Sequence, residues 1–159
     1  MRLECCRYYA ELCPPDLSQF VLPGVPELLA SLSLASSEDG AVLLALVTGN
    51  YEPVARLKLA RAGIGSFFGT GQGAFGSDDE DRAGLPAIAR RRAGARGHPH
   101  PRDRTIVIGD TPRDIVCAHA DDVHCIAVAT GPFKADELAD ADTVVTDARE
   151  LRAALARLT

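Results

Sequence analysis

Short apolar runs alternate along the chain with stretches in which apolar residues recur at helical spacing. Runs that are apolar on both faces predict buried parallel strands, at 41–47, 105–110, 124–130 and 143–146. Helical spacing predicts helices at 25–34, 52–63, 83–93, 112–120, 134–139 and from 147 to the end. This alternation is typical of an α/β fold with a doubly wound, parallel, Rossmann-like sheet.

The first residues do not follow this pattern. A weakly helical stretch runs from Cys5 to Leu12 and stops at Pro14-Pro15. We therefore divide the chain into an irregular segment, 1–22, and an α/β core, 23–159.

Composition and charge narrow the class of protein. The chain has 159 residues, of which 47% are hydrophobic and 25% charged, as expected for one globular domain. A net charge of -5 argues against nucleic acid as a partner, and no apolar run is long enough to cross a membrane. Its 5 cysteines are odd in number and lack the paired spacing of a zinc site, which favours a reduced, cytoplasmic protein.

Ligands of an open parallel sheet bind beyond the carboxyl ends of its strands, so the residues at those ends are the candidates for chemistry. Thr48, Gly49 and Asn50 follow the first predicted strand and begin a helix. A hydroxyl and successive N–H groups at that position can hold a phosphoryl oxygen. The structural alternative is that Asn50 caps the helix and Thr48 only ends the strand.

A second strand end carries two carboxylates. Asp110 ends an apolar strand, and Asp114 lies in the first turn of the helix that Pro112 opens. One carboxylate together with phosphate and water is a usual way to hold Mg²⁺. Alternatively, Thr111 caps this helix and Asp114 completes a capping box.

These residues fit a known pattern. LVTGN at 46–50 resembles the second motif of the haloacid dehalogenase (HAD) superfamily, and GDTPRD at 109–114 resembles its fourth. The resemblance covers residues 22–159, and the strand and ATGP turn after the fourth motif resemble small phosphatases of the phosphoglycolate phosphatase type. The resemblance implies a HAD-like core and a Mg²⁺-dependent phosphatase that acts on a small phosphorylated metabolite through an aspartyl-phosphate.

The resemblance also implies roles for single residues. Thr48, Gly49 and Asn50 would bind the transferred phosphoryl group, and Asp110 would ligate Mg²⁺. Asp114 would support the metal through water or orient a cationic residue. The family's lysine has no counterpart, because Lys58 and Lys134 are misplaced, so Arg82 is the best substitute, with phosphate-binding and catalytic roles. The alternative for Arg82 is a surface ion pair with Asp78, Asp79 or Asp81.

The family's nucleophile has no counterpart in this chain. Asp16 and Asp39 do not follow an apolar strand, and the D-x-D pairs at 79–81 and 140–142 lie in polar runs. The resemblance thus implies a core that lacks its first central strand and most of its cap, with 1–22 as a cap remnant or linker. We expect a chain whose beginning is missing, inactive as given, whose unpaired strand edges favour homo-oligomers. The alternative is a non-catalytic descendant that binds phosphate or a protein.

Overall fold

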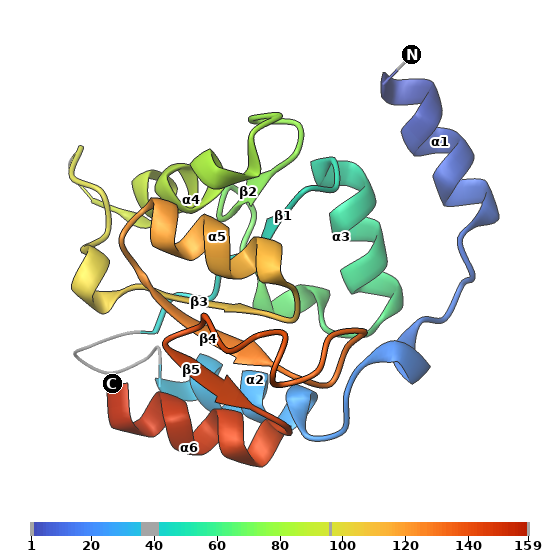
Figure 1. Ribbon diagram of the computed structural model, residues 1–159. Coiled ribbons are helices and arrows are strands. Elements are labelled where there is room, and N and C mark those ends of the chain that lie inside the picture. The colour runs from blue at the N-terminus through green and yellow to red at the C-terminus, as the bar shows by residue number, and fades with distance from the viewer. Residues whose placement is uncertain (1, 36–41, 96, 159) are drawn as a thin grey trace.

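The fold is taken from a computed structural model that describes residues 2–35, 42–95 and 97–158 (Figure 1). Helices and strands alternate, and all the strand pairs are parallel. The helices are α1 (Arg2–Leu12), α2 (Val25–Ala35), α3 (Glu52–Arg61), α4 (Leu85–Ala93), α5 (Pro112–Ala120) and α6 (Ala148–Leu158). The strands are β1 (Val47–Thr48), β2 (Ala74–Phe75), β3 (Ile106–Gly109), β4 (His124–Val128) and β5 (Thr143–Val145).

The described strands form two separate sheets. One contains β1 and β2, and the other contains β3, β4 and β5 in that order. β1 and β3 therefore each have a hydrogen-bonded neighbour on one side only. Leu43, ahead of β1, is 50% exposed, and Ile108 in β3 is 45% exposed, so apolar surface is open to solvent beside both strands.

Helices cover both faces of the sheet that β3, β4 and β5 form. Leu28 of α2 and Leu151 of α6 pack with Ile126 of β4 in one buried cluster. Ile115 of α5 packs with Cys125 of β4 in a second cluster on the opposite face, as the layers in Figure 1 show. The predicted α/β fold with parallel sheets and helices on both faces is confirmed.

Three local predictions differ from the structure. The strand predicted at 41–47 is regular only at Val47–Thr48, because its sole described partner is the two-residue strand β2; Ala41 lies outside the described residues. The helix predicted at 134–139 is a series of turns, in which N–H groups bond three residues back instead of four. β2 was not predicted.

Helix α1 lies beside α3 (Figure 1). The Arg61 guanidinium of α3 donates to the carbonyl of Ala10, at 3.0 Å, and to that of Cys13, so it satisfies carbonyls at the end of α1. A backbone bond from Leu17 to the Arg61 carbonyl, 2.9 Å long, adds a third link. None of the described helices has the length and apolar character that a membrane span requires.

Candidate active site

The residues Thr48, Gly49 and Asn50, which we call the cradle, lie between the end of β1 and the start of α3. The Thr48 hydroxyl oxygen accepts hydrogen bonds from the Asn50 backbone N–H, at 3.2 Å, and from its side-chain amide, at 3.0 Å. A hydroxyl that accepts two bonds still has its own hydrogen to donate. The cradle thus offers a hydroxyl donor whose orientation is fixed by its neighbour.

The cradle is backed by the turn that follows β2. A Cβ atom at Gly76 would lie 2.1 Å from the Gly49 carbonyl oxygen, so only glycine fits there. The Gly76 N–H donates to the Asn50 carbonyl at 3.0 Å. These contacts hold the backbone of the cradle against the loop after β2.

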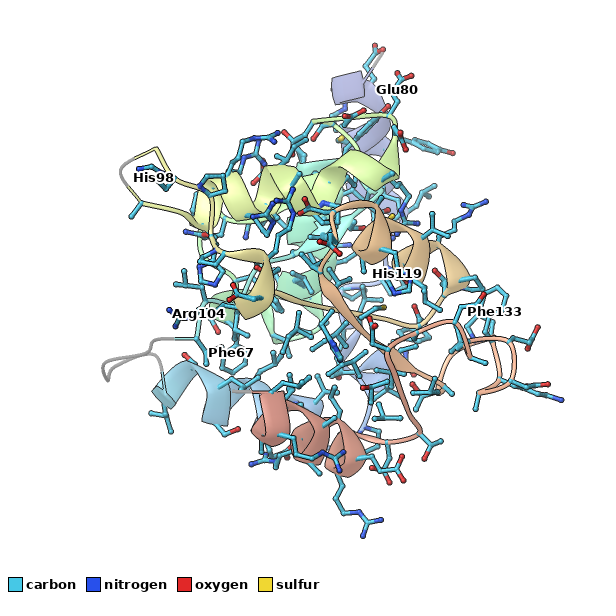
Figure 2. All side chains as sticks on the ribbon, turned by 60° about the vertical axis from the view of Figure 1, so that its left-hand side comes forward. Phe67, Glu80, His98, Arg104, His119 and Phe133 are labelled. Atoms are coloured by element: carbon cyan, nitrogen blue, oxygen red, sulfur yellow. The ribbon has the colours of Figure 1, made fainter. Side chains whose placement is uncertain are left out.

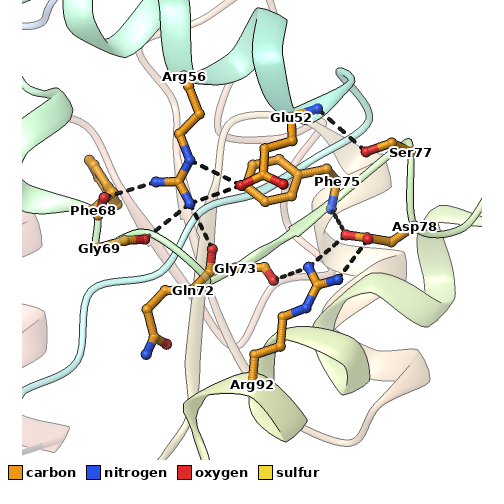
Figure 3. Close-up of polar contacts among 10 residues, drawn as sticks. All are labelled: Glu52, Arg56, Phe68, Gly69, Gln72, Gly73, Phe75, Ser77, Asp78 and Arg92. Atoms are coloured by element: carbon orange, nitrogen blue, oxygen red, sulfur yellow. Dashed lines mark hydrogen bonds and ion pairs between the residues drawn. The ribbon is translucent and has the colours of Figure 1, made fainter. Parts of the chain in front are cut away.

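Two arginines hold the glycine-rich loop around β2 (Figure 3). Arg56 of α3 donates to the carbonyls of residues 68, 69 and 72, and its guanidinium lies 5.3 Å from the centre of the Phe75 ring. Arg92 of α4 pairs with both oxygens of Asp78, each at 2.7 Å. This loop is therefore fixed on both sides.

Arg82 follows this loop, in the short 3-10 helix η3 (Arg82–Gly84) that leads into α4. Asp81 caps η3 by accepting the Ala83 N–H at 3.0 Å. The Arg82 side chain passes over Gly49, where a Cβ atom would lie 3.4 Å from its Cδ. Its Nη2 is 3.0 Å from Asp114 Oδ1, and its buried Nε has no hydrogen-bond partner among the described residues. Arg82 therefore joins the β1 end to the β3 end.

Both carboxylate oxygens of Asp114 are occupied. Oδ1 pairs with Arg82, and Oδ2 accepts from the Thr111 hydroxyl at 2.7 Å and from the N–H groups of Thr111, at 3.1 Å, and Asp110, at 3.2 Å. Asp114 is the N3 residue of α5, so the capping-box interpretation and the orienting role for the cation both describe it. Oδ1 has only the contact with Arg82, so it keeps a lone pair, and the predicted part of Asp114 in a metal site stays a prediction.

Asp110 is exposed at the end of β3, and its carboxylate accepts no hydrogen bond within the described chain. A Cβ atom at Gly131 would lie 2.5 Å from Asp110 Oδ2, so glycine leaves room for this carboxylate. The described residues contain no cluster of three or more His, Cys, Asp or Glu that could hold a metal. One free carboxylate fits Mg²⁺ bound mainly through phosphate and water, but not a site that the protein completes alone.

Lys58, which the sequence interpretation set aside, reaches the cradle. Its ammonium donates to Asn50 Oδ1 at 3.2 Å and lies 5.3 Å from the centre of the Tyr9 ring. The sequence gives no signal for this contact, because Asn50 lies ahead of the first turn of α3 and the approach of Lys58 depends on side-chain rotamers. Lys134, by contrast, is exposed in the turns after β4.

The other acidic pairs have structural contacts. Asp79 accepts the Asp81 N–H at 2.9 Å, which together with the cap on η3 makes both residues part of one turn. Asp142 accepts the Cys125 N–H at 2.8 Å and lies 3.2 Å from the His119 imidazole. Asp110 and Asp114 are the described carboxylates at the end of β3, and Asp81, which caps η3, lines the pocket beside Arg82.

A pocket of about 240 Å³ opens beside Arg82. Its lining residues are Asp81, Arg82, Ala83, Pro112, Arg113, Val116 and Cys117. Burial raises the pKa of the Cys117 thiol, which disfavours the thiolate needed for nucleophilic attack, although nearby Arg82 opposes the shift.

A larger hollow of about 550 Å³ is lined by α4 and by residues 99–103. These residues directly follow His98, which is labelled in Figure 2. In this hollow the Arg90 and Arg102 side chains already pair with Asp121. We therefore assign the site to the cradle and the smaller pocket.

Comparison with known proteins agrees with part of this picture. Residues 83–151 match the family described as HAD-hydrolase-like, so this region forms a HAD-hydrolase-like domain. The match includes Asp110, Asp114 and Gly131, but begins after Arg82 and does not reach the cradle. No curated protein matches the chain.

Proposed function

We propose that the HAD-hydrolase-like region and the cradle together form the phosphate- and Mg²⁺-binding part of a phosphatase site for a small phosphorylated metabolite. The observation that carries this proposal is the contact chain from Gly49 through Arg82 and Asp114 to Asp110. It joins groups that bind phosphoryl oxygens to a carboxylate suited to Mg²⁺.

Each group has a distinct task in this proposal. The Thr48 hydroxyl donates to one phosphoryl oxygen, and the Gly49 backbone N–H lies next to it in the chain. Arg82 contributes positive charge at the mouth of the site, where its side chain is 35% exposed. Asp114 orients the guanidinium and caps α5, which keeps the cation at the mouth of the site.

Asp110 is the residue that would hold Mg²⁺. The ion would neutralise charge on the phosphoryl oxygens when bound, with phosphate and water as its remaining ligands. The space that Gly131 leaves beside Asp110 supports this assignment. Asp114 orients Arg82 in this proposal, and it can also support the ion through a bound water.

We further propose that this chain binds phosphate without hydrolysing a phosphomonoester. Phosphoryl transfer to the protein needs a nucleophile that can reach the phosphorus atom. Of the described aspartates at the site, Asp110 is assigned to the metal, Asp114 pairs with Arg82 and Thr111, and Asp81 caps η3. The pocket of about 240 Å³ beside Arg82 suits a small substrate.

Two measurements test the proposal. Isothermal titration calorimetry with inorganic phosphate and Mg²⁺ should detect binding by the chain, and Arg82→Met and Asp110→Asn should each weaken it. Asp136→Asn, in the exposed turns after β4, is the matched control for the loss of one carboxylate. Absence of phosphate binding by the unmodified chain would reject the proposal.

The second measurement concerns turnover. Hydrolysis of para-nitrophenyl phosphate with Mg²⁺ should be undetectable. Clear turnover that Asp110→Asn abolishes would show that the site does contain a working nucleophile.

A further inference from the structure

We infer that Lys58 is a positioning residue, which keeps the Thr48 hydroxyl hydrogen free for a phosphoryl oxygen by fixing the Asn50 side chain, and that Tyr9 of α1 holds Lys58 in place. This inference rests on the proposed function of the cradle. It assigns a role to a helix outside the α/β core.

The Asn50 amide has two orientations that fill the same space but offer opposite hydrogen-bonding groups. In the structure its Nδ2 donates to the Thr48 hydroxyl oxygen at 3.0 Å, and its Oδ1 accepts from Lys58 at 3.2 Å. The flipped amide would turn its NH₂ donors toward the ammonium, which is itself only a donor. Lys58 therefore selects the observed orientation.

This choice decides what Thr48 can do. With Nδ2 toward Thr48, the hydroxyl accepts and its hydrogen remains available for a ligand. With Oδ1 toward Thr48, the hydroxyl would donate its hydrogen to Asn50 and present only lone pairs to a phosphate. Lone pairs repel an anion, so the flipped state would bind phosphate poorly.

The position of Lys58 is itself determined by two contacts. Its ammonium lies 5.3 Å from the centre of the Tyr9 ring, within the range of a cation–π interaction, and its side chain is half-buried. A free lysine side chain samples many rotamers, so a ring on one side and an amide on the other narrow its positions.

Tyr9 is held in turn by the packing of α1 on α3. The Arg61 bonds to the Ala10 and Cys13 carbonyls fix the end of α1 next to the helix that carries Lys58. Figure 1 shows the two helices side by side. A displacement of α1 would therefore move the Tyr9 ring away from Lys58 and so affect the cradle.

The experiment compares inorganic phosphate binding, with Mg²⁺, by the unmodified chain and by lysine variants in calorimetry. Lys58→Met should weaken binding roughly tenfold, the scale of one charge-assisted hydrogen bond. Lys58→Arg keeps a charged donor and should retain most of the affinity. Lys134→Met is the matched control, because the sequence has no other lysine, and should bind as the unmodified chain does.

A second readout tests the amide directly. In ¹H–¹⁵N spectra without phosphate, the Asn50 side-chain amide signals should move in Lys58→Met and stay in Lys134→Met. Thermal melting of the same variants shows whether the fold is kept. If Lys58→Met does not fold, the comparison uses Tyr9→Leu and Tyr9→Phe instead. Tyr9→Leu loses the aromatic ring and should weaken phosphate binding, whereas Tyr9→Phe keeps the ring and should bind as the unmodified chain does.

The outcomes separate the inference from the proposed function. Unchanged phosphate affinity and unchanged Asn50 signals in Lys58→Met would overturn the inference while phosphate binding by the unmodified chain still supports the function. If the unmodified chain binds no phosphate, the proposed function fails and the inference fails with it.

Discussion

The Arg90–Asp121 ion pair should be a main determinant of stability. Arg90 of α4 donates to both oxygens of Asp121, at 2.6 and 3.0 Å, and the two side chains are only 8% and 3% exposed. Arg102 reaches the same carboxylate at 3.1 Å but is 56% exposed. One buried and one exposed arginine thus share a single acid.

The burial of each partner sets the expected magnitude. Arg90→Met leaves a buried carboxylate without its main partner, and losing one member of a buried pair costs about 3–5 kcal/mol. Arg102→Met removes a solvent-exposed partner, and such pairs contribute about 0–1 kcal/mol. The two variants remove the same charge, but Arg90 makes two bonds to the carboxylate and Arg102 makes one, so their difference reports burial and bidentate pairing together.

The assay is urea unfolding near neutral pH for both variants, followed by a pH series on the unmodified chain. Hydrogen bonds from Arg90 lower the pKa of Asp121, although burial opposes them. A carboxylate whose pKa is lower in the folded state stabilises it above the unfolded pKa of about 3.9. That contribution should decline as the pH falls from there through the folded pKa, and Asp121→Asn should lack this part of the acid dependence.

Equal losses of stability in Arg90→Met and Arg102→Met would refute the reasoning. So would an Asp121→Asn variant that is as stable as the unmodified chain near neutral pH. If Arg90→Met does not fold, Arg90→Lys provides a smaller change. It keeps the charge and loses the bidentate geometry.

Thr48→Val should weaken phosphate binding about tenfold in calorimetry, since it removes the hydroxyl donor, whereas Thr48→Ser should restore most of it. Gly131→Ala should raise the Mg²⁺ concentration needed to support phosphate binding, because its Cβ would lie 2.5 Å from Asp110 Oδ2. Cys125 should resist a thiol reagent at about pH 8 until the protein is unfolded, as counted by mass spectrometry, since burial raises its pKa to about 11. Ile108→Lys should reduce concentration-dependent self-association in analytical ultracentrifugation, because it places a charge on an exposed apolar edge strand.

The elements that could be predicted are those with a clear apolar period. β3, β4 and β5 occur within the predicted runs, because buried parallel strands need side chains that are apolar on both faces. β2 could not be predicted: its two residues lie inside a glycine-rich loop and are too few to show a period. At 134–139 the apolar residue Leu138 is buried within a turn. One buried side chain does not require a helix, so the apolar spacing predicted the wrong element there.

Part of the candidate site could likewise be predicted from the sequence, and part could not. That the cradle and Asp110 lie at strand ends follows from the apolar runs and from the rule that ligands bind beyond those ends. The sequence left two partners open for Arg82: Asp114, 32 residues away, which the resemblance assigns to orient the cation, or one of the nearby acids Asp78, Asp79 and Asp81. The Lys58 contact depends on side-chain rotamers, which a linear pattern does not contain.

The site stands where the two sheets meet without backbone pairing. Gly49 after β1 and Asp114 after β3 are linked through the Arg82 side chain, and Arg90 ties α4 to the end of α5. Side-chain contacts thus link the two sheets where backbone hydrogen bonds link the strands of a continuous sheet. We therefore expect the Arg82–Asp114 contact to break at a lower free-energy cost than unfolding of the core. A parallel strand supplied between the β1 and β3 edges would pair their backbone groups, and a carboxylate at its end would point toward the phosphate cradle. We therefore expect hydrolytic activity and sheet continuity to be gained together, by the same addition.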